Sequence, residues 1–320
     1  TSRGNSSHAL AAFLLAGIPG MASFHRWVFI PFGLMYLIAV LGNSTILQVV
    51  RVHRRLHKPM YYFLSMLATT DLGLTLSTLP TMLHIFWFSA REISFPACLT
   101  QMFCIHACSF MESSVLLAMA FDRYLAVCCP LRNSSILTGA RIAKIGLGIV
   151  CRCTLTQLPL ICLLTRLPFC RSHVLSHPYC LHQDMIRLAC TDATLNSLYS
   201  LTLVLIVILD SVLIALSYTM IIRTVLGITS REEQAKALNT CVAHFCAVLV
   251  FYIPFAGLSI IHQYGKNVAP ISHAVMANVY LFVPPVLNPI LYSMKSKDVR
   301  KGFRELLCQR VAWPGHGWSH

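Results

Sequence analysis

Seven long apolar segments alternate with short polar stretches along the chain. Each segment is close to the roughly 20 residues that an α-helix needs to cross the hydrocarbon core of a bilayer. None shows the two-residue alternation of a membrane β-strand. The pattern therefore predicts an all-α protein, a bundle of seven transmembrane helices at about residues 27–50, 60–85, 98–121, 142–164, 196–222, 238–261 and 272–292.

A shorter pattern follows the seventh segment. Between Ser296 and Leu307, basic residues alternate with apolar ones such as Val299 and Phe303, which is typical of an amphipathic helix on the inner leaflet. No polar stretch is long enough for a second domain. We therefore expect an extracellular tail at 1–26, a membrane domain at 27–293 and a cytoplasmic tail at 294–320 that carries this short eighth helix.

The composition agrees with a membrane protein and gives its orientation. Only 11% of the residues are charged, against roughly 25% in a soluble domain. Lys and Arg near the ends of spans stay in the cytoplasm, and most of the 25 lie after the first, third, fifth and seventh segments. This predicts a multi-pass protein of the plasma membrane with its N-terminus outside. Most of the net charge of +14 then faces anionic lipids on the cytoplasmic side, and we expect no nucleic-acid binding.

Cysteines and one glycan signal fall on the predicted outer side. An oxidising compartment permits disulfides there, but four cysteines allow three pairings. The sequence Asn5-Ser6-Ser7 is an acceptor for N-glycosylation. The outer cysteines are Cys98, Cys170, Cys180 and Cys190.

Ionisable residues inside the spans are candidate functional residues, because a charge in hydrocarbon is costly. Five stand out: Asp71, Glu112, Arg152, Asp210 and His244. Since consecutive spans are usually neighbours, we predict that Arg152 neutralises Asp71 and Glu112 in a buried polar cluster. The sequence leaves open whether this cluster is a structural clamp or rearranges during signalling.

Other classes of membrane protein fit the sequence poorly. A retinal pump needs a lysine in its last span, and residues 272–292 contain none. No Ser, His and Asp arrangement suggests nucleophilic catalysis, so we expect no enzymatic activity and no cofactor. A transporter is expected to show internal repeats, which are absent, but a seven-span transporter or channel remains the alternative function.

Four motifs together resemble rhodopsin-type G-protein-coupled receptors. The third span ends in Asp122-Arg123-Tyr124, and the seventh ends in Asn288-Pro289-Ile290-Leu291-Tyr292, where the proline predicts a kink. The other two are Leu41-Gly42-Asn43 and the outer Cys98. The resemblance implies that a ligand signals through a heterotrimeric G protein.

Further stretches resemble the olfactory receptors within that class. They are Pro59-Met60-Tyr61-Tyr62-Phe63-Leu64, Met119 through Cys128, Pro130-Leu131-Arg132, and Lys236-Ala237-Leu238-Asn239-Thr240-Cys241 with His244. The outer stretch from Leu167 to Cys190 and Gly257-Leu258-Ser259 look like the fish-like class I branch, family 51. The resemblance implies a small volatile odorant as ligand, and a stimulatory olfactory-type G protein that raises cAMP.

The resemblance also implies residue roles. Cys98 would pair with Cys180, and Cys170 with Cys190. A lock at the cytoplasmic side would favour the resting state until the sixth span moves outward. The implied coupling and activation residues are Asp122, Arg123, Tyr124, Tyr218, His244, Asn288, Pro289 and Tyr292.

Helical spacing and the resemblance together give candidate ligand contacts in the extracellular half of the bundle. His182 and Gln183 would cap a cavity, although a metal site of His177, Cys180 and His182 is a competing interpretation. Ordinary helix packing competes for each wall position. Class I receptors tuned to carboxylic acids tend to carry Arg where this chain has Gln263, so a carboxylate ligand is in doubt. The candidate walls are Ile105, His106, Ser109, Thr202, Ile206, Tyr252, Phe255, Ser259 and Gln263.

Overall fold

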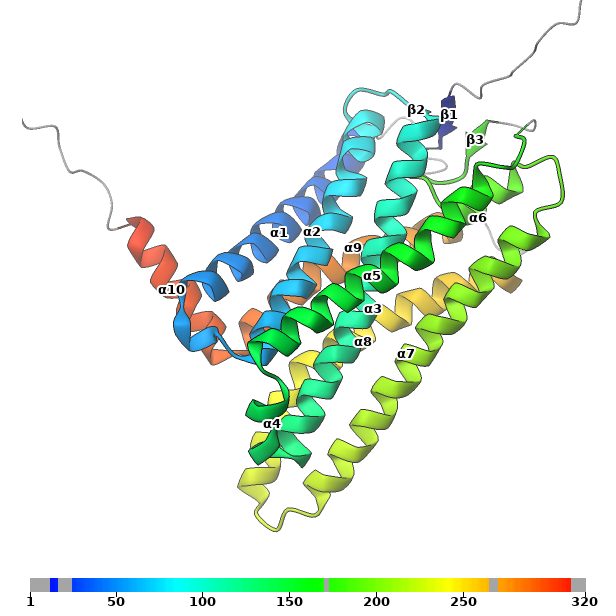
Figure 1. Ribbon diagram of the computed structural model, residues 1–320. Helices are drawn as coiled ribbons and strands as arrows, with labels where there is room; N and C mark the ends of the chain where they lie inside the picture. Colours follow the sequence, from blue (N-terminus) through cyan, green and yellow to red (C-terminus); the bar gives the residue numbers. More distant parts are fainter. Residues whose placement is uncertain (1–11, 17–24, 170–172, 265–269, 312–320) are drawn as a thin grey trace, which may run out of the picture.

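The computed structural model describes residues 12–16, 25–169, 173–264 and 270–311. Seven long helices run side by side as a bundle, with α3 packed against four of the others (Figure 1). This confirms the predicted seven-helix architecture. The seven are α1 (His25–Val52), α2 (Pro59–Phe86), α3 (Phe95–Cys128), α5 (Gly139–Leu164), α7 (Thr194–Leu226), α8 (Arg231–Tyr264) and α9 (Pro270–Lys295).

The helices differ in how apolar they are. Six helices in the described part of the chain are long and apolar enough to cross a membrane. The remaining long helix, α2, has the same length as α1 but carries a polar inward face. Thr70, Asp71, Thr75 and Thr78 on this face are all buried. Each of these four side chains makes at least one hydrogen bond inside the bundle, so α2 can be a span although its inward face is polar.

Short helices occupy the cytoplasmic side: η2 (Arg54–Leu56), α4 (Pro130–Ile136) and α10 (Lys297–Val311). Helix α10 is the predicted amphipathic segment, and it turns away from the bundle beside the end of α1 (Figure 1). Arg55 donates to both carboxylate oxygens of Glu305 at 3.1 and 2.9 Å. His53 Nε2 lies 2.7 Å from the same carboxylate. These contacts hold α10 against the first cytoplasmic turn, and they keep the pKa of Glu305 below its usual range.

A small sheet on the outer side was not predicted by the sequence. Strand β1 (Ala12–Leu15) lies between β2 (Glu92–Ser94) and β3 (Val174–Leu175). It pairs antiparallel with β2 and parallel with β3, and it buries Phe13 and Leu15 completely or nearly so. The segment Ala12–Leu15 is therefore tied to the first and second outer loops, at the end of the bundle where the strands gather in Figure 1.

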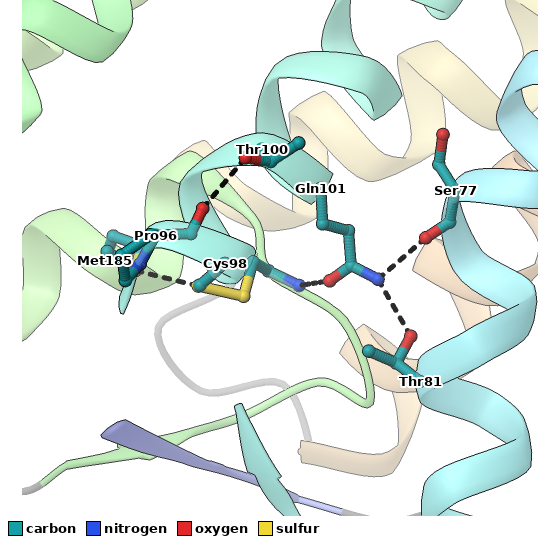
Figure 2. Close-up of a disulfide and its surroundings, with 8 residues drawn as sticks. Ser77, Thr81, Pro96, Cys98, Thr100, Gln101 and Met185 are labelled. Atoms are coloured by element: carbon teal, nitrogen blue, oxygen red, sulfur yellow. Dashed lines mark hydrogen bonds between the residues drawn. A yellow bond between two sulfur atoms is a disulfide. The ribbon is translucent and has the colours of Figure 1, made fainter. Parts of the chain in front are cut away.

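A disulfide fixes the second outer loop to α3. Cys98 and Cys180 are bonded, with their Cα atoms 5.5 Å apart, which confirms the first predicted pairing. Gln101 strengthens this anchor, because its Oε1 accepts from the backbone N–H of Cys180 at 2.9 Å. Its Nε2 donates to Ser77 O and Thr81 Oγ1 of α2 (Figure 2). The chain then enters the short helix α6 (His182–Arg187).

Helices α1 and α9 meet at a proline. Pro289 has no N–H, so the carbonyl of Pro285, four residues earlier, lacks its helical donor. Asn43 Nδ2 donates to this carbonyl at 2.9 Å. Gly42 allows the approach, because a Cβ there would lie only 2.8 Å from Cγ of Pro289. The Gly42-Asn43 pair thus accommodates the ring and replaces the missing bond.

Replacing Gly42 by Ala should destabilise the receptor. In a helix interior, Ala is normally better than Gly by about 0.5–1 kcal/mol. At Gly42 the new methyl group meets a rigid ring, and overpacking of this kind costs about 1–3 kcal/mol. Gly148→Ala is the matched control, because no atom of the described residues lies within 4 Å of its Cβ position. Thermal unfolding in detergent should show a lower midpoint for Gly42→Ala only, and equal midpoints would contradict this packing.

Candidate functional site

The ion pair inside the membrane domain is not the one the sequence predicted. Arg152 of α5 donates to both carboxylate oxygens of Asp210 in α7, each at 3.0 Å. Its other terminal nitrogen donates to Ser114 Oγ at 3.0 Å. The prediction that Arg152 neutralises Asp71 and Glu112 is therefore wrong. Arg152 lies in the span next to α3, but its side chain reaches across to α7 and not to α2.

Asp71 and Glu112 share an amide donor in place of an arginine. Asn288 Nδ2 of α9 lies 3.0 Å from Asp71 Oδ2 and 3.4 Å from Glu112 Oε1. All three side chains are buried. Asn288 thereby joins α2, α3 and α9 at one point, directly before the proline of the seventh span.

The Arg152–Asp210 pair continues into the sixth span. Ser113 Oγ donates to Asp210 Oδ2 at 3.0 Å, and it lies 2.8 Å from the hydroxyl of Tyr252 in α8. A carboxylate can only accept, so the single Ser113 proton points to Asp210 and Tyr252 donates to Ser113. The chain Arg152, Asp210, Ser113, Tyr252 thus crosses α5, α7, α3 and α8.

Two histidines lie near each other beneath the anchored loop. His182 of α6 is buried and lies close enough to His106 of α3 for the charges to interact. Among the described residues, His106 Nε2 and both ring nitrogens of His182 are buried without a hydrogen bond of good geometry, and Asn196 is the polar side chain beside His182. An unpaired buried polar atom costs about 1–3 kcal/mol. These three nitrogens therefore favour a ligand that offers a polar group.

The other predicted wall residues divide into groups. Ser109 is buried and faces Tyr280 of α9, and Ser259 donates to Phe255 O within α8 at 2.8 Å. Gln183 is partly buried. Packing dominates at four further positions, because these side chains belong to apolar clusters or pack against them: Ile105, Ile206, Tyr252 and Phe255.

The structure does not place two of the predicted ligand contacts, Thr202 and Gln263, in the wall of the pocket. Thr202 is exposed, and its hydroxyl donates to Leu198 O of its own helix at 3.0 Å, so the structure does not bring it to the inward face of α7. Leu203 and Val207 are buried there. The side chain of Gln263 lies outside what the structure describes.

Sequence reasoning missed several polar residues of the helices and of the second outer loop. Asn196 of α7 is buried beside His182, and Tyr280 of α9 faces Ser109. Tyr179 of the second outer loop is fully buried. The available signal was a single polar group in an apolar run, as at Tyr280, but nothing in the sequence fixed which way it faced.

The cytoplasmic end holds the residues of the expected lock. Arg123 Nε donates to Asp122 Oδ2 at 3.1 Å, and a second guanidinium nitrogen pairs with the same oxygen. Tyr124 is partly buried beside them. Tyr292 of α9 is completely buried, with its hydroxyl 3.9 Å from Met119 Sδ. The adjacent acid and base are thus bonded to each other in this structure.

His244 fastens the sixth span to two neighbours. Its Nε2 lies 3.0 Å from Leu116 O of α3, and its Nδ1 lies 2.7 Å from the Tyr218 hydroxyl of α7. A carbonyl only accepts, so Nε2 carries the proton and Nδ1 accepts from Tyr218. Both rings are stacked, with centroids 5.8 Å apart. Outward movement of the cytoplasmic half of α8 has to break the bond to Leu116.

The second outer loop argues against the alternative metal site, whereas the second disulfide and the glycosylation site stay predictions. Cys180 is in a disulfide and His177 Nδ1 lies 2.5 Å from Asp184, so the competing metal site loses its sulfur ligand. Cys190 is also disulfide-bonded, but Cys170 lies outside the described residues. The predicted glycosylation site at Asn5 lies outside them as well.

The chain was compared with known proteins. A family model described as Olfactory receptor matches residues 32–310. Olfactory receptor 51G1 of Homo sapiens is 53% identical over 314 residues, 97% of this chain and 98% of that protein. Olfactory receptor 51I2, also of Homo sapiens, is 55% identical over 292 residues, 91% of this chain and 94% of that protein. The chain belongs to the olfactory receptor family.

Family membership confirms several predictions from the sequence. The relatives lie in family 51, the class I branch, and the chain is a multi-pass membrane receptor of the odorant-sensing type. It is not an enzyme. The family implies an odorant ligand and coupling to a G protein. The alternative of a seven-span transporter or channel is therefore set aside.

Breaking the Arg152–Asp210 pair on one side should destabilise this olfactory receptor. Asp210→Asn leaves the guanidinium without its counter-charge, and removing one partner of a buried ion pair costs about 3–5 kcal/mol. The double variant Arg152→Gln with Asp210→Asn removes both charges and should regain most of this loss. Thermal unfolding of the purified receptor measures both effects. A double variant no better than Asp210→Asn would contradict the pairing.

His182 should make the stability of the olfactory receptor depend on pH. Burial, followed by the nearby His106, lowers the pKa of His182 from 6.5 to about 3. The unfolded chain therefore takes up the proton first, and stability is lost as the pH falls below 6.5. Between pH 7.5 and 5.5 this loss is about 1.4 kcal/mol.

Thermal unfolding at the two pH values tests the His182 effect. His182→Gln should remove this part of the pH dependence, whereas His173→Gln should not, because His173 is exposed. His106 is the titratable group that faces His182, and His177 is bound to Asp184. An unchanged pH dependence in His182→Gln would contradict the assignment.

Proposed function

We propose that the receptor binds a small, uncharged volatile organic ligand in the extracellular half of its helix bundle. The juxtaposition of His106 and His182 carries this proposal, because their buried ring nitrogens can donate to or accept from a ligand oxygen. Ser109, Gln183 and Ser259 supply further polar groups, and apolar neighbours supply the walls, as in small-molecule sites generally.

The charge of the ligand follows from the protonation state of His182 and from the residue type at position 263. A carboxylate needs a cation to offset the loss of its hydration. His182 has a pKa of about 3 and is neutral at physiological pH, and Gln263 stands where class I receptors tuned to acids tend to carry Arg. Alcohols, esters and ketones therefore fit better than acids. Gln263→Arg would add the missing cation.

The proposed signal passes through α8. Ligand contacts at Ser259 and above would favour a state in which the cytoplasmic half of α8 has moved outward and Arg123 is exposed. A ligand shifts the populations only through its different affinity for the two states. The G protein is proposed to be the stimulatory olfactory type, which raises cAMP. The roles of Asp122, Tyr124, Tyr218, His244, Asn288, Pro289 and Tyr292 in this step belong to the same proposal, as do the plasma membrane and the tail boundaries at 26 and 294.

Cyclic AMP measured in cells with the stimulatory olfactory G protein and a trafficking helper tests this function. We expect responses to alcohols, esters or ketones of matched length, little response to carboxylic acids, and a gain of acid response in Gln263→Arg. Arg123→Ala should abolish the cAMP response at unchanged surface level, because Arg123 makes the proposed contact with the G protein.

Two outcomes would contradict the proposal. A robust acid response of the unchanged receptor would mean that another residue supplies the cation that is missing at Gln263, and the charge argument would fail. Retained ligand-stimulated cAMP in Arg123→Ala, at normal surface level, would refute the assigned role of Arg123. Surface level is measured in the same cells by antibody binding to an outer tag.

A further inference from the structure

A groove lies on the lipid-facing side of the bundle, and neither His106 nor His182 lines it. It has a volume of about 610 Å³ and is formed by side chains of α3, α5 and α7, among them Ser114, Phe121, Arg152, Leu216 and Ser217. Its volume falls within the roughly 300–1,000 Å³ of small-molecule sites. Phe121 and Leu216 are 42% and 56% exposed. Because the chain is a membrane protein, this exposed surface faces lipid.

The groove has one strongly polar point. The side chain of Arg152 is 32% exposed, whereas that of its partner Asp210 is 5% exposed. A guanidinium has five N–H donors, and Arg152 makes three hydrogen bonds within the part of the chain that the structure describes, to Ser114 and to the two oxygens of Asp210. Lipid tails cannot accept a hydrogen bond. The remaining donors favour an oxygen atom on whatever occupies the groove.

The charge of the site selects an uncharged occupant. Asp210 already balances Arg152, so the pair as a whole is neutral. A carboxylate or phosphate placed beside it would add an uncompensated negative charge in a low-dielectric region, which is costly. A hydroxyl or carbonyl oxygen accepts from the guanidinium without adding charge. The remaining lining is mainly apolar, with Leu117, Ile149 and Met220 among its members.

We propose that this groove is a second binding site for an uncharged aliphatic amphiphile dissolved in the membrane, with its single oxygen accepting from Arg152. Medium-chain ketones, alcohols and esters have this chemistry. The site is separate from the proposed odorant pocket between His106 and His182, and the binding claim does not depend on that pocket.

Occupancy has a defined effect on α8. An oxygen that accepts from Arg152 weakens the hold of Arg152 on Asp210, so Asp210 accepts more strongly from Ser113. Hydrogen bonds in a chain polarise one another, so the bond that Tyr252 donates to Ser113 also strengthens. Tyr252 lies on α8, which is then held more firmly in the resting position. The amphiphile therefore opposes activation by an odorant, an effect that rests on the proposed function.

Photolabelling of the purified full-length receptor in phosphatidylcholine nanodiscs tests the binding claim. The probe is a medium-chain methyl ketone that carries an alkyl diazirine, and mass spectrometry locates the label. We expect labelling around Ile149 and Leu216 that excess unlabelled ketone removes. Leu216→Trp fills the groove and should reduce labelling at least about tenfold, equivalent to 1.4 kcal/mol.

Leu209→Trp is the matched control. Leu209 lies on the same helix and is 56% exposed, like Leu216, but it does not line the groove. The Leu209→Trp variant should be labelled around Ile149 and Leu216 as strongly as the unchanged receptor. Equal labelling in Leu216→Trp, or labelling that unlabelled ketone does not reduce, would overturn the proposal, because both mean only general exposure to lipid. Competition by cholesterol and not by ketone would overturn the assigned occupant.

A second measurement separates this proposal from the proposed function. At a fixed amphiphile concentration, the odorant concentration giving half-maximal cAMP should rise at least about fivefold, the lower end of typical coupling between sites. Leu216→Trp should abolish that rise, and a rise that persists in it would overturn the effect on α8. A receptor that gives no cAMP response to any odorant, but whose labelling is reduced by unlabelled ketone as expected, would refute the proposed function. The proposed binding site in the groove would still be supported.

Discussion

Charged side chains inside the bundle have to find partners within the protein, because lipid tails offer none. The structure meets this constraint at two points in mid-membrane. Arg152 and Asp210 pair across α5 and α7, and Asn288 lies between Asp71 and Glu112. Each point also involves α3, through Ser113 and Ser114 in one case and Glu112 in the other. The central position of α3 follows from these bonds as much as from apolar packing.

The outer loop depends on a second set of bonds to α3. The Cys98–Cys180 disulfide fixes one point of the loop, but one covalent point leaves rotation free. Gln101 removes that freedom, because it accepts from the Cys180 backbone while it donates to α2. His182 follows two residues later, at the first position of α6. Its place near His106 therefore follows from the anchored backbone on either side of Cys180.

The spans were predictable from sequence because hydrocarbon thickness sets helix length. Their ends were less so, since α3 and α8 continue past the membrane to 34 residues each. The partner of Arg152 was predicted wrongly because the depth of a residue in the membrane does not distinguish between possible partners. Counted from the cytoplasmic ends of their helices, Arg152, Asp210 and Glu112 all lie roughly 20–24 Å deep. Only the direction of each side chain around its helix separates them, and packing sets that direction. The outer sheet was missed because strands of two to four residues leave no periodic pattern.

Helix α8 is held at two levels, and the strength of this hold bounds what a ligand has to supply. Tyr252 donates to Ser113 near mid-membrane, and His244 donates to Leu116 O nearer the cytoplasm. A hydrogen bond contributes about 0.5–1.5 kcal/mol net, so these two bonds to α3 together contribute about 1–3 kcal/mol to the resting position. A ligand that contacts α8 above Tyr252 reverses such a preference if its affinity for the two states differs by slightly more than this. One or two well-placed hydrogen bonds to a small molecule are enough, which explains how a ligand with a single polar group can move a helix of 34 residues.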